Sequence, residues 1–270
     1  MNEQQFLQNY SQDNYDRPSI ATDIAAFSLR TVKSEDYRAS PELKLCVLLI
    51  RRGEHPFRGQ WALPGGFLQR GESLDDCAFR ELREETNLKP VSMLWVDTFS
   101  QPDRDPRGWI ISHAYASVIA EEDARIAGGT DAADARWFEV TFREECESCW
   151  RMELRDGENL LTALLRAESS ATARTRFAIV ENDGLAFDHA AILAGAMETL
   201  RREGGNLETA FAFLPEKFTL FALQKVQETL LGITLLTANF RRKIADFVEE
   251  TDEFIEGAGH RPARLFRKKR

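Results

Sequence analysis

The sequence predicts a mixed α/β domain followed by a smaller domain of two helices and a β-hairpin. In the first half of the chain, β-rich runs surround one strongly patterned helix, at residues 20–29, 43–50, 91–99, 109–119 and 135–140. The C-terminal third instead has two helical patterns, followed by two short β-runs around Gly257-Ala258-Gly259. A chain of 270 residues is long enough for two separate cores, so we expect domains at 1–204 and 205–270.

Composition and charge narrow the class of protein. Apolar residues make up 43% of the chain, which is ordinary for a globular protein. The polar start MNEQQFLQNYSQDNYDRP lacks the apolar core of a signal peptide, and no run approaches the length of a membrane span, so we expect a cytoplasmic protein with no membrane partner. The net charge of −9 is uneven, because residues 205–270 carry 11 Lys and Arg against 9 Asp and Glu. That part has a net charge of +2, which leaves −11 for the first 204 residues.

The most informative segment, residues 65–88, reads GGFLQRGESLDDCAFRELREETNL. Its second half has a helical pattern, with Ser73 as the N-cap and Asp76 as the capping-box partner. We expect one apolar face to anchor this helix in a core, through Leu74, Ala78 and Leu82.

Three carboxylates share another face of this helix. Glu81, Glu84 and Glu85 stand at i, i+3 and i+4, so they repel one another unless a cation lies between them. Mg²⁺ or Mn²⁺, which prefer hard oxygen ligands and bridge phosphates, are the natural candidates. The alternative is a solvated acidic helix with ordinary ion pairs to Arg80 and Arg83.

The segment resembles the Nudix box, the signature of hydrolases that cleave a nucleoside diphosphate linked to another group. Asn87 departs from the family pattern, which has glycine there, but Asn tolerates the left-handed conformation that ends a helix. The resemblance implies an α/β/α sandwich and metal-dependent hydrolysis. In this resemblance, Arg80 orients the carboxylates through Glu72. The implied catalytic residues are Glu81, Glu84, Glu85, Arg80 and Glu72, and the implied metal ligands are Glu81, Glu84, Glu85 and the Gly65 carbonyl.

Two further segments indicate a substrate. Arg104 and Arg107, in FSQPDRDPRGWIISHAYASVI, could grip a diphosphate with their planar guanidinium groups, or could be ordinary loop charges. Asp188, in GLAFDHAAILAGAMETLRR, is expected to cap a helix. Both segments are similar to stretches of Nudix proteins that handle ADP-ribose, notably the Nudix-related regulators of NAD metabolism and their enzyme relatives. The expected substrate-binding residues are Arg104, Arg107, Gly66 and Phe67, and the candidates for stacking on adenine are Trp61, Phe67 and Phe99.

Residues 142–182 form a segment for which neither resemblance offers a role. We expect a hairpin between WRMEL and RFAIV, with residues 168–175 as its loop. Cys146 and Cys149 form a C-x-x-C pair without the further ligands that a zinc site needs, so they are left out of the site. Cys46 and Cys77 are expected to be small buried apolar residues.

The C-terminal third resembles a winged helix-turn-helix. The strings FTLFALQ and NFRRKI are similar to the domain fused to Nudix modules in the NAD-linked regulators and related sugar-linked regulators. The pattern itself predicts a helix at 219–231, with Gly232 as its stop. The resemblance implies a recognition helix at 238–247 in a DNA major groove, and a basic wing. We expect Phe247 to face inward, and a homodimer to bind double-stranded DNA. The DNA-binding residues implied are Arg241, Arg242, Lys243, Arg264, Arg267 and Lys268. A dimerisation module or plain solvated surface is the alternative.

Two functions remain open at this point. The first, favoured by the complete set of charged box residues, is a Mg²⁺- or Mn²⁺-dependent hydrolase acting on ADP-ribose or a nucleotide sugar. The alternative is a non-catalytic transcriptional regulator that binds ADP-ribose or a sugar to reposition the winged helix on DNA.

Overall fold

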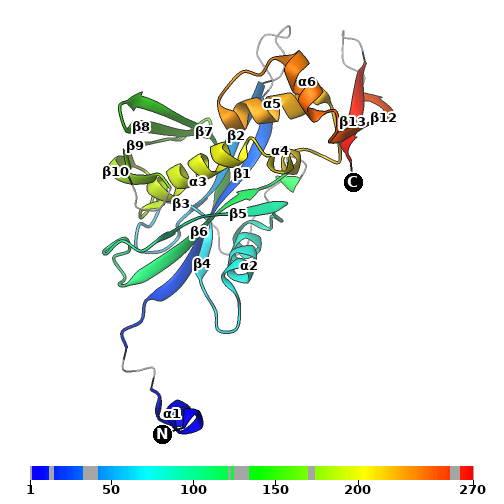
Figure 1. The fold of residues 1–270 in the computed structure, drawn as a ribbon. Helices are drawn as coiled ribbons and strands as arrows, with labels where there is room; N and C mark the ends of the chain where they lie inside the picture. Colours follow the sequence, from blue (N-terminus) through cyan, green and yellow to red (C-terminus); the bar gives the residue numbers. More distant parts are fainter. Residues whose placement is uncertain are drawn as a thin grey trace.

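The computed structural model describes residues 2–11, 15–32, 42–120, 123–124, 134–169, 174–255 and 262–269 (Figure 1). A ten-stranded mixed sheet forms its centre. The strands are β1 (Ser19–Val32), β2 (Glu42–Arg51), β3 (Trp61–Ala62), β4 (Gly65–Phe67), β5 (Ser92–Phe99), β6 (Ile110–Val118), β7 (Ala135–Cys146), β8 (Cys149–Arg155), β9 (Leu160–Glu168) and β10 (Arg176–Asp183). The main path runs β10-β9-β8-β7-β2-β1-β6-β5, while β3 pairs with β2 and β4 pairs with β1.

Two helices, α2 (Leu74–Thr86) and α3 (His189–Glu203), cover opposite faces of this sheet. Ile24 and Ala26 of β1 belong to the same apolar cluster as Leu82 of α2. Ala25 and Phe27, which alternate with them, belong to a second cluster with residues of α3. Because both faces are buried here, the strand is apolar at each position from Ile24 to Phe27. The expected α/β/α sandwich is therefore confirmed.

The five β-runs predicted in the first half of the chain are all strands. β1 lies parallel to β6 and antiparallel to β2, and β5 pairs antiparallel with β6. The run expected at 135–140 continues as β7 to Cys146, which carries the sheet into the segment that had no predicted role.

Residues 142–182 extend the central sheet as an antiparallel meander from β7 to β10. The predicted hairpin between WRMEL and RFAIV is wrong, because β9 lies between the strands that contain them and pairs with both. Residues 168–175 connect β9 to β10, and positions 170–173 of that connection lie outside the described residues. Cys146 and Cys149 flank the turn between β7 and β8, where their sulfur atoms are paired in a disulfide and their Cα atoms are 4.9 Å apart. Cys46 and Cys77 are free and buried, as expected.

The C-terminal part is a winged helix. It contains α4 (Leu207–Ala212), β11 (Lys217–Phe218), α5 (Leu220–Leu231), α6 (Thr237–Ile244), β12 (Val248–Ile255) and β13 (Ala263–Lys268). The strands form a three-stranded sheet in the order β11-β13-β12. Thr219 caps α5, and Gly232 ends it in the left-handed conformation at the predicted stop.

Two details of the winged helix differ from the prediction. α6 ends at Ile244, and the side chain of Phe247 is 50% exposed instead of facing inward. Phe247 is outside the helix, so the spacing of three from Ile244 no longer places it on the buried face. Helix α4 was not predicted, because its six residues are too few for a clear helical pattern.

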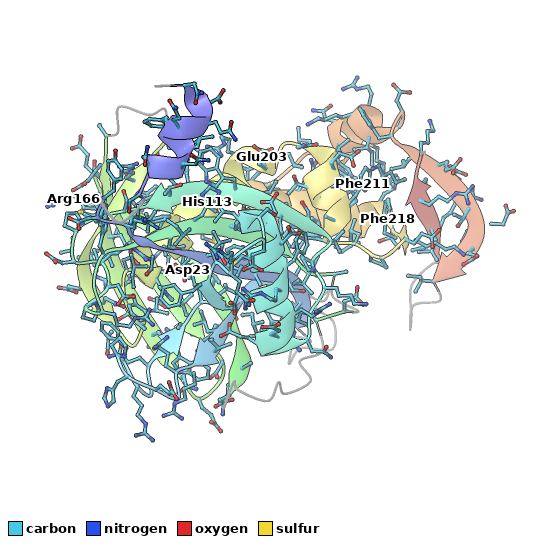
Figure 2. All side chains as sticks on the ribbon, turned by 90° about the horizontal axis from the view of Figure 1, so that it is seen from below. Asp23, His113, Arg166, Glu203, Phe211 and Phe218 are labelled. Carbon is cyan, nitrogen blue, oxygen red and sulfur yellow. A yellow bond between two sulfur atoms is a disulfide. The ribbon has the colours of Figure 1, made fainter. Side chains whose placement is uncertain are left out.

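The expectation of two separate cores is also wrong, because one apolar cluster runs from the sheet into the winged helix. This cluster contains Phe27 of β1, Leu200 of α3, Leu223 of α5 and Ile244 of α6. Figure 2 labels Asp23 in the sandwich, Glu203 near the end of α3, and Phe211 and Phe218 in the winged helix beyond it. The winged helix is therefore packed onto the sandwich, where α5 contacts both α3 and β2.

Contacts at the end of α3 join the two parts. The backbone carbonyl of Gly204 accepts a hydrogen bond from Gln227 Nε2 of α5 at 3.3 Å. A Cβ atom at position 204 would lie 2.9 Å from Leu230 Cβ, so only glycine allows this close approach.

The N-terminal helix α1 (Glu3–Asn9) was not predicted and buries none of its residues. In Figure 1 it lies away from the sandwich, beyond the start of β1. In the described residues, no helix combines the length and the apolar character that crossing a bilayer requires.

Candidate nucleotide site and DNA-binding surface

Helix α2 is held at both ends by local interactions. Ser73 Oγ accepts the backbone N–H of Asp76 at 3.1 Å, and Asp76 Oδ2 accepts the N–H of Ser73 at 3.2 Å, which completes the predicted capping box. Asn87 ends the helix with φ 58°, the left-handed conformation expected for it. Ala78 and Leu82 are fully buried beneath the helix and Leu74 is half-buried, so the acidic face points away from the core.

Arg80 organises the acidic residues of the box. Its guanidinium donates two hydrogen bonds to Glu72, at 2.8 and 3.1 Å, and one to Glu81 at 2.6 Å. It also reaches Glu84 at 3.3 Å and the carbonyl of Phe67 at 3.2 Å. The contact with Glu72 expected from the sequence is therefore present. The hydrogen bonds from Arg80 lower the pKa of Glu72 to about 2, so this carboxylate stays ionised.

Glu81 and Glu85 lie against the glycine strand β4. Glu85 Oε2 accepts the backbone N–H of Gly65 at 2.9 Å. A Cβ atom on Gly66 would come within 2.3 Å of Glu81 Oε1, so a side chain there would displace the Glu81 carboxylate. Burial raises the pKa of Glu85 to about 8, and the neighbouring charges of Glu81 and Asp23 contribute to this increase.

The box residues fit a divalent cation chemically. Within the described ranges, no group of three or more His, Cys, Asp or Glu side chains is arranged to hold a metal ion. Burial is the main cause of the raised pKa of Glu85, and the nearby charges of Glu81 and Asp23 add to it; a hard cation beside these carboxylates would offset both effects. Glu84 has a more exposed side chain, at 54%, than Glu81, at 14%. A bound cation would use the predicted ligands, namely Glu81, Glu84, Glu85 and the Gly65 carbonyl.

A cavity of about 190 Å³ lies beside the box and brings together residues that are distant in sequence. All four predicted substrate-binding residues line it, together with Gly65 and Glu85 of the box. Those four are Gly66, Phe67, Arg104 and Arg107. We call it the box cavity.

Arg104 is engaged in a buried ion-pair network at the edge of this cavity. Its side chain is 5% exposed and donates two hydrogen bonds to Asp188, at 2.7 and 2.9 Å. A third, at 3.3 Å, reaches Asp23. Asp188 stands at the N-cap position of α3, but its side chain makes no capping hydrogen bond, so the predicted cap is wrong. Arg104 binds that carboxylate more strongly than a backbone N–H would.

His189 and Ser112 complete the network around Asp23. Ser112 Oγ donates to Asp23 Oδ2 at 2.5 Å. His189 Nδ1 accepts the backbone N–H of Leu63 at 2.8 Å, so a neutral ring carries its proton on Nε2, 3.5 Å from Asp23 Oδ1. Burial lowers the pKa of His189, which favours this neutral form.

Arg107 has a more open position. It is 43% exposed and pairs with the buried Asp105 at 2.6 Å. Its guanidinium carbon lies 5.1 Å from the ring centroid of Phe67 and 5.4 Å from that of Phe187.

Sequence reasoning missed Arg52, Phe187 and His189, which also line the box cavity. The available signal for Arg52 was a charged pair directly after the apolar run 43–50. No sequence signal marks Phe187, because its position depends on the left-handed backbone conformation there, with φ 51°.

The three aromatic residues proposed for stacking differ in position. Trp61 is 5% exposed and packs edge-on against Phe138 at 4.9 Å, so it belongs to the core. Phe67 is 41% exposed and lines the box cavity. Phe99 lines a neighbouring cavity of about 400 Å³, which Arg104 and Asp188 also line.

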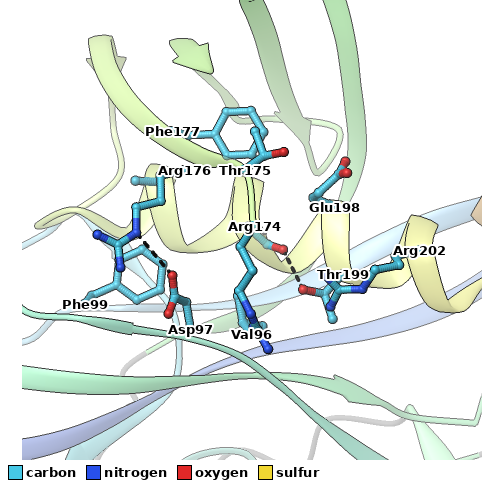
Figure 3. Close-up of a pocket in the computed structure, with 12 residues that line it drawn as sticks. Val96, Asp97, Phe99, Arg174, Thr175, Arg176, Phe177, Glu198, Thr199 and Arg202 are labelled. Carbon is cyan, nitrogen blue, oxygen red and sulfur yellow. Dashed lines mark hydrogen bonds and ion pairs between the residues drawn. The ribbon is translucent and has the colours of Figure 1, made fainter. Parts of the chain in front are cut away.

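A third cavity lies between β5, β10 and α3 (Figure 3). Its volume of about 30 Å³ is that of one or two water molecules, so it cannot hold a nucleotide. Arg176 crosses it to reach Asp97, with Nε 3.4 Å from Oδ2, and none of the box residues line it.

The basic residues of the winged helix fall into two groups. Arg241, Arg242 and Lys243 are exposed on α6, and within the described residues no carboxylate pairs with them. Arg242 donates to Asn239, at 2.7 Å. The basic residues of β13 are instead paired with acids: Arg264 with Glu250, Arg267 with Glu249, and Lys268 with Glu208. Among these predicted DNA-binding residues, the unpaired positive charge therefore lies on α6.

Fold and site together define a two-part protein, an α/β/α sandwich with a carboxylate-bearing box followed by a winged helix. Residues 37–142 match the NUDIX domain family, and residues 210–267 match the NrtR DNA-binding winged helix domain. The chain thus combines a Nudix domain with a winged helix domain of the NrtR type.

Known proteins resemble either the whole chain or the Nudix part. The ADPR responsive transcriptional repressor NtrR of Acinetobacter baylyi is 29% identical over 98% of this chain and 88% of its own length. The structure of Shewanella oneidensis NrtR complexed with a 27mer DNA has a TM-score of 0.64 and 26% identity, over 93% of each chain. The ADP-ribose pyrophosphatase of Methanocaldococcus jannaschii is 42% identical over 35% of this chain and 54% of its own length.

We predict that Glu85→Gln stabilises the metal-free protein at about pH 8 and has little effect near pH 4. The folded-state pKa of Glu85, about 8, lies above the ordinary value of roughly 4.3. The folded protein therefore retains a proton that the unfolded chain releases, and stability falls as pH rises between these values, by on the order of a few kcal/mol. Denaturant unfolding in EDTA across this range measures the difference. Glu84→Gln is the matched control, and equal pH dependence of wild type and Glu85→Gln would contradict the prediction.

Proposed function

We propose that the protein is a transcriptional regulator whose Nudix domain binds ADP-ribose and whose winged helix binds DNA. The arrangement of α3 carries this proposal. Its first residue, His189, lines the box cavity, and Asp188 just before it pairs with Arg104, which also lines the cavity. The other end of α3 packs on α5 of the winged helix. A ligand that shifts the first turn would therefore act on the DNA-binding part through packed contacts.

The ligand class follows from similarity and from cavity chemistry. Similarity along nearly the whole chain to an ADPR responsive repressor supports ADP-ribose, and favours regulation over a dedicated hydrolase. The box cavity offers the exposed guanidinium of Arg107 for a diphosphate and the exposed ring of Phe67 for a flat group, while Arg104 lines the cavity but is held by Asp188 and Asp23.

DNA binding is assigned to the unpaired charges of α6. Arg241, Arg242 and Lys243 would face the major groove, as in other winged helices. The paired residues Arg264, Arg267 and Lys268 would contact phosphates only after exchanging their carboxylate partners. Two copies bound to a palindromic site would form a homodimer, and a DNA-binding role implies a cytoplasmic location.

The proposed function predicts reciprocal coupling between ADP-ribose and DNA. ADP-ribose should change the affinity for promoter DNA by about five- to 150-fold, and DNA should change the affinity for ADP-ribose by the same factor. Mobility-shift titrations of the promoter upstream of the protein's own operon measure the first factor, and calorimetry with and without that duplex measures the second. An unchanged DNA affinity at saturating ADP-ribose would remove the regulator proposal.

A second prediction separates α6 from the wing. Replacing both Arg241 and Arg242 with Ala should weaken promoter binding more than binding to random duplex, because these side chains would face base edges. Replacing both Arg264 and Arg267 with Ala is the matched control, and should weaken both duplexes alike. The log–log salt slope should fall by about 0.9 for each phosphate that a variant no longer neutralises. Equal effects of the two double variants on promoter selectivity would argue against α6 as the recognition helix.

Hydrolysis of the bound nucleotide is a second candidate function, favoured by the intact Arg80–Glu72–Glu81 arrangement. Arg80 would hold Glu81 in place, while the more exposed Glu84 would accept a proton from water. A bound Mg²⁺ or Mn²⁺ would polarise the diphosphate.

If hydrolysis occurs, Glu85→Gln should lower its rate on the order of a hundredfold or more, because the amide keeps the shape but removes a charge that the cation needs. A phosphate-release screen of nucleoside diphosphate derivatives with Mg²⁺ or Mn²⁺ measures this. Near-normal turnover by the variant would contradict the metal assignment, and a wild-type protein without turnover would leave only the sensing role.

A further inference from the structure

Arg52 lines the box cavity without an acidic partner. It follows the end of β2, and its Nε–H donates to the carbonyl of Pro56 at 2.8 Å. In the described part of the chain, no carboxylate lies within ion-pair distance of its guanidinium. Arg51, the residue before it, makes an equivalent bond to the carbonyl of Gly59 at 3.1 Å, yet is exposed and does not line the cavity.

Phe187 carries two guanidinium groups at this end of the cavity. The guanidinium carbon of Arg52 lies 4.7 Å from its ring centroid, and that of Arg107 lies 5.4 Å from it. Phe57 meets the same ring edge-on at 4.7 Å, which limits its movement. Phe187 has φ 51°, an unfavourable conformation for a bulky residue that the surrounding packing must maintain.

The positive charges of Arg52 and Arg107 are only partly compensated by acidic residues. Asp105 neutralises Arg107 but is not paired with Arg52. Burial lowers the pKa of Arg52, and the nearby positive charge of Arg107 lowers it further. An anion held between the two groups would relieve this repulsion, and guanidinium groups offer the fork geometry that phosphate oxygens match.

We propose that Arg52 and Arg107, supported on the Phe187 ring, form a clamp that binds one phosphate of a nucleoside diphosphate ligand without a metal ion. The proposal rests on the proposed function, since it assigns the phosphate-recognition end of the same cavity. Glu85 of α2 also lines this cavity and places a box carboxylate in its wall. One phosphate of a diphosphate would therefore meet the two guanidinium groups, and the other would lie towards the box carboxylates. Arg52 would thus select ligands by their phosphate, independently of hydrolysis.

The test measures binding of ADP-ribose and of inorganic pyrophosphate to the full-length protein in EDTA, by calorimetry. Wild type should bind both. Arg52→Ala should weaken both by about ten- to a hundredfold, because the variant cannot form the charge-assisted hydrogen bonds to phosphate. Arg51→Ala removes the same charge and an equivalent loop hydrogen bond, and should change either affinity by less than about threefold, as for a screened surface charge.

Two further variants separate the clamp from a folding defect. Arg52→Gln keeps a hydrogen-bond donor for the Pro56 carbonyl but has no charge, so it should bind as weakly as Arg52→Ala while unfolding at the wild-type temperature. Arg52→Lys keeps the charge without the planar fork, and should give an intermediate affinity.

Three results would overturn the clamp. They are wild-type affinity in both Arg52→Ala and Arg52→Gln, equal decreases in affinity in the Arg51 and Arg52 variants, and no binding of either probe by wild type in EDTA. The proposed function fails separately. If wild type binds both probes and the Arg52 variants bind neither, but ADP-ribose leaves DNA affinity unchanged, the clamp stands and the regulator does not.

Discussion

The ion pair between Arg104 and Asp188 holds the last helix of the sandwich in its place. Arg104 also reaches Asp23 of β1, so one buried guanidinium joins the central strand, the loop before β6 and the start of α3. Removing one partner of such a pair leaves an uncompensated buried charge, which costs about 3–5 kcal/mol. The orientation of α3, and with it the position of the winged helix, therefore depends on charges that lie at the box cavity.

Local patterns explain how much of this arrangement the sequence predicts. Helix α2, its capping box and its left-handed end at Asn87 depend on residues within one segment, and all three are confirmed. The end of α5 at Gly232 likewise depends on a local residue pattern. Glu85 and the glycine strand meet at the box cavity because the helix and that strand are themselves local features.

The misses concern contacts between distant residues or elements with weak patterns. Asp188 has the sequence context of a helix cap, but its carboxylate pairs with Arg104, 84 residues away in sequence, which no local pattern reveals. Strand β9 lies between the two segments expected to pair, because the choice among antiparallel neighbours depends on the whole sheet. In the sequence, Arg52 looks like an ordinary charged residue after a strand. Its role depends on its contact with Phe187, which is distant in sequence.

The continuous apolar core provides the physical connection between the sandwich and the winged helix. Domains joined by a flexible linker are only weakly coupled energetically. Here, α3, α5 and β1 contribute to one apolar cluster. Close-packed interiors respond to a displacement by repacking as a unit, since they contain few voids to absorb it. At the junction, Gly204 lies in close contact with Leu230. A change in the charge balance around Asp188 therefore has a short, densely packed route to the helices that carry Arg241 and Arg242.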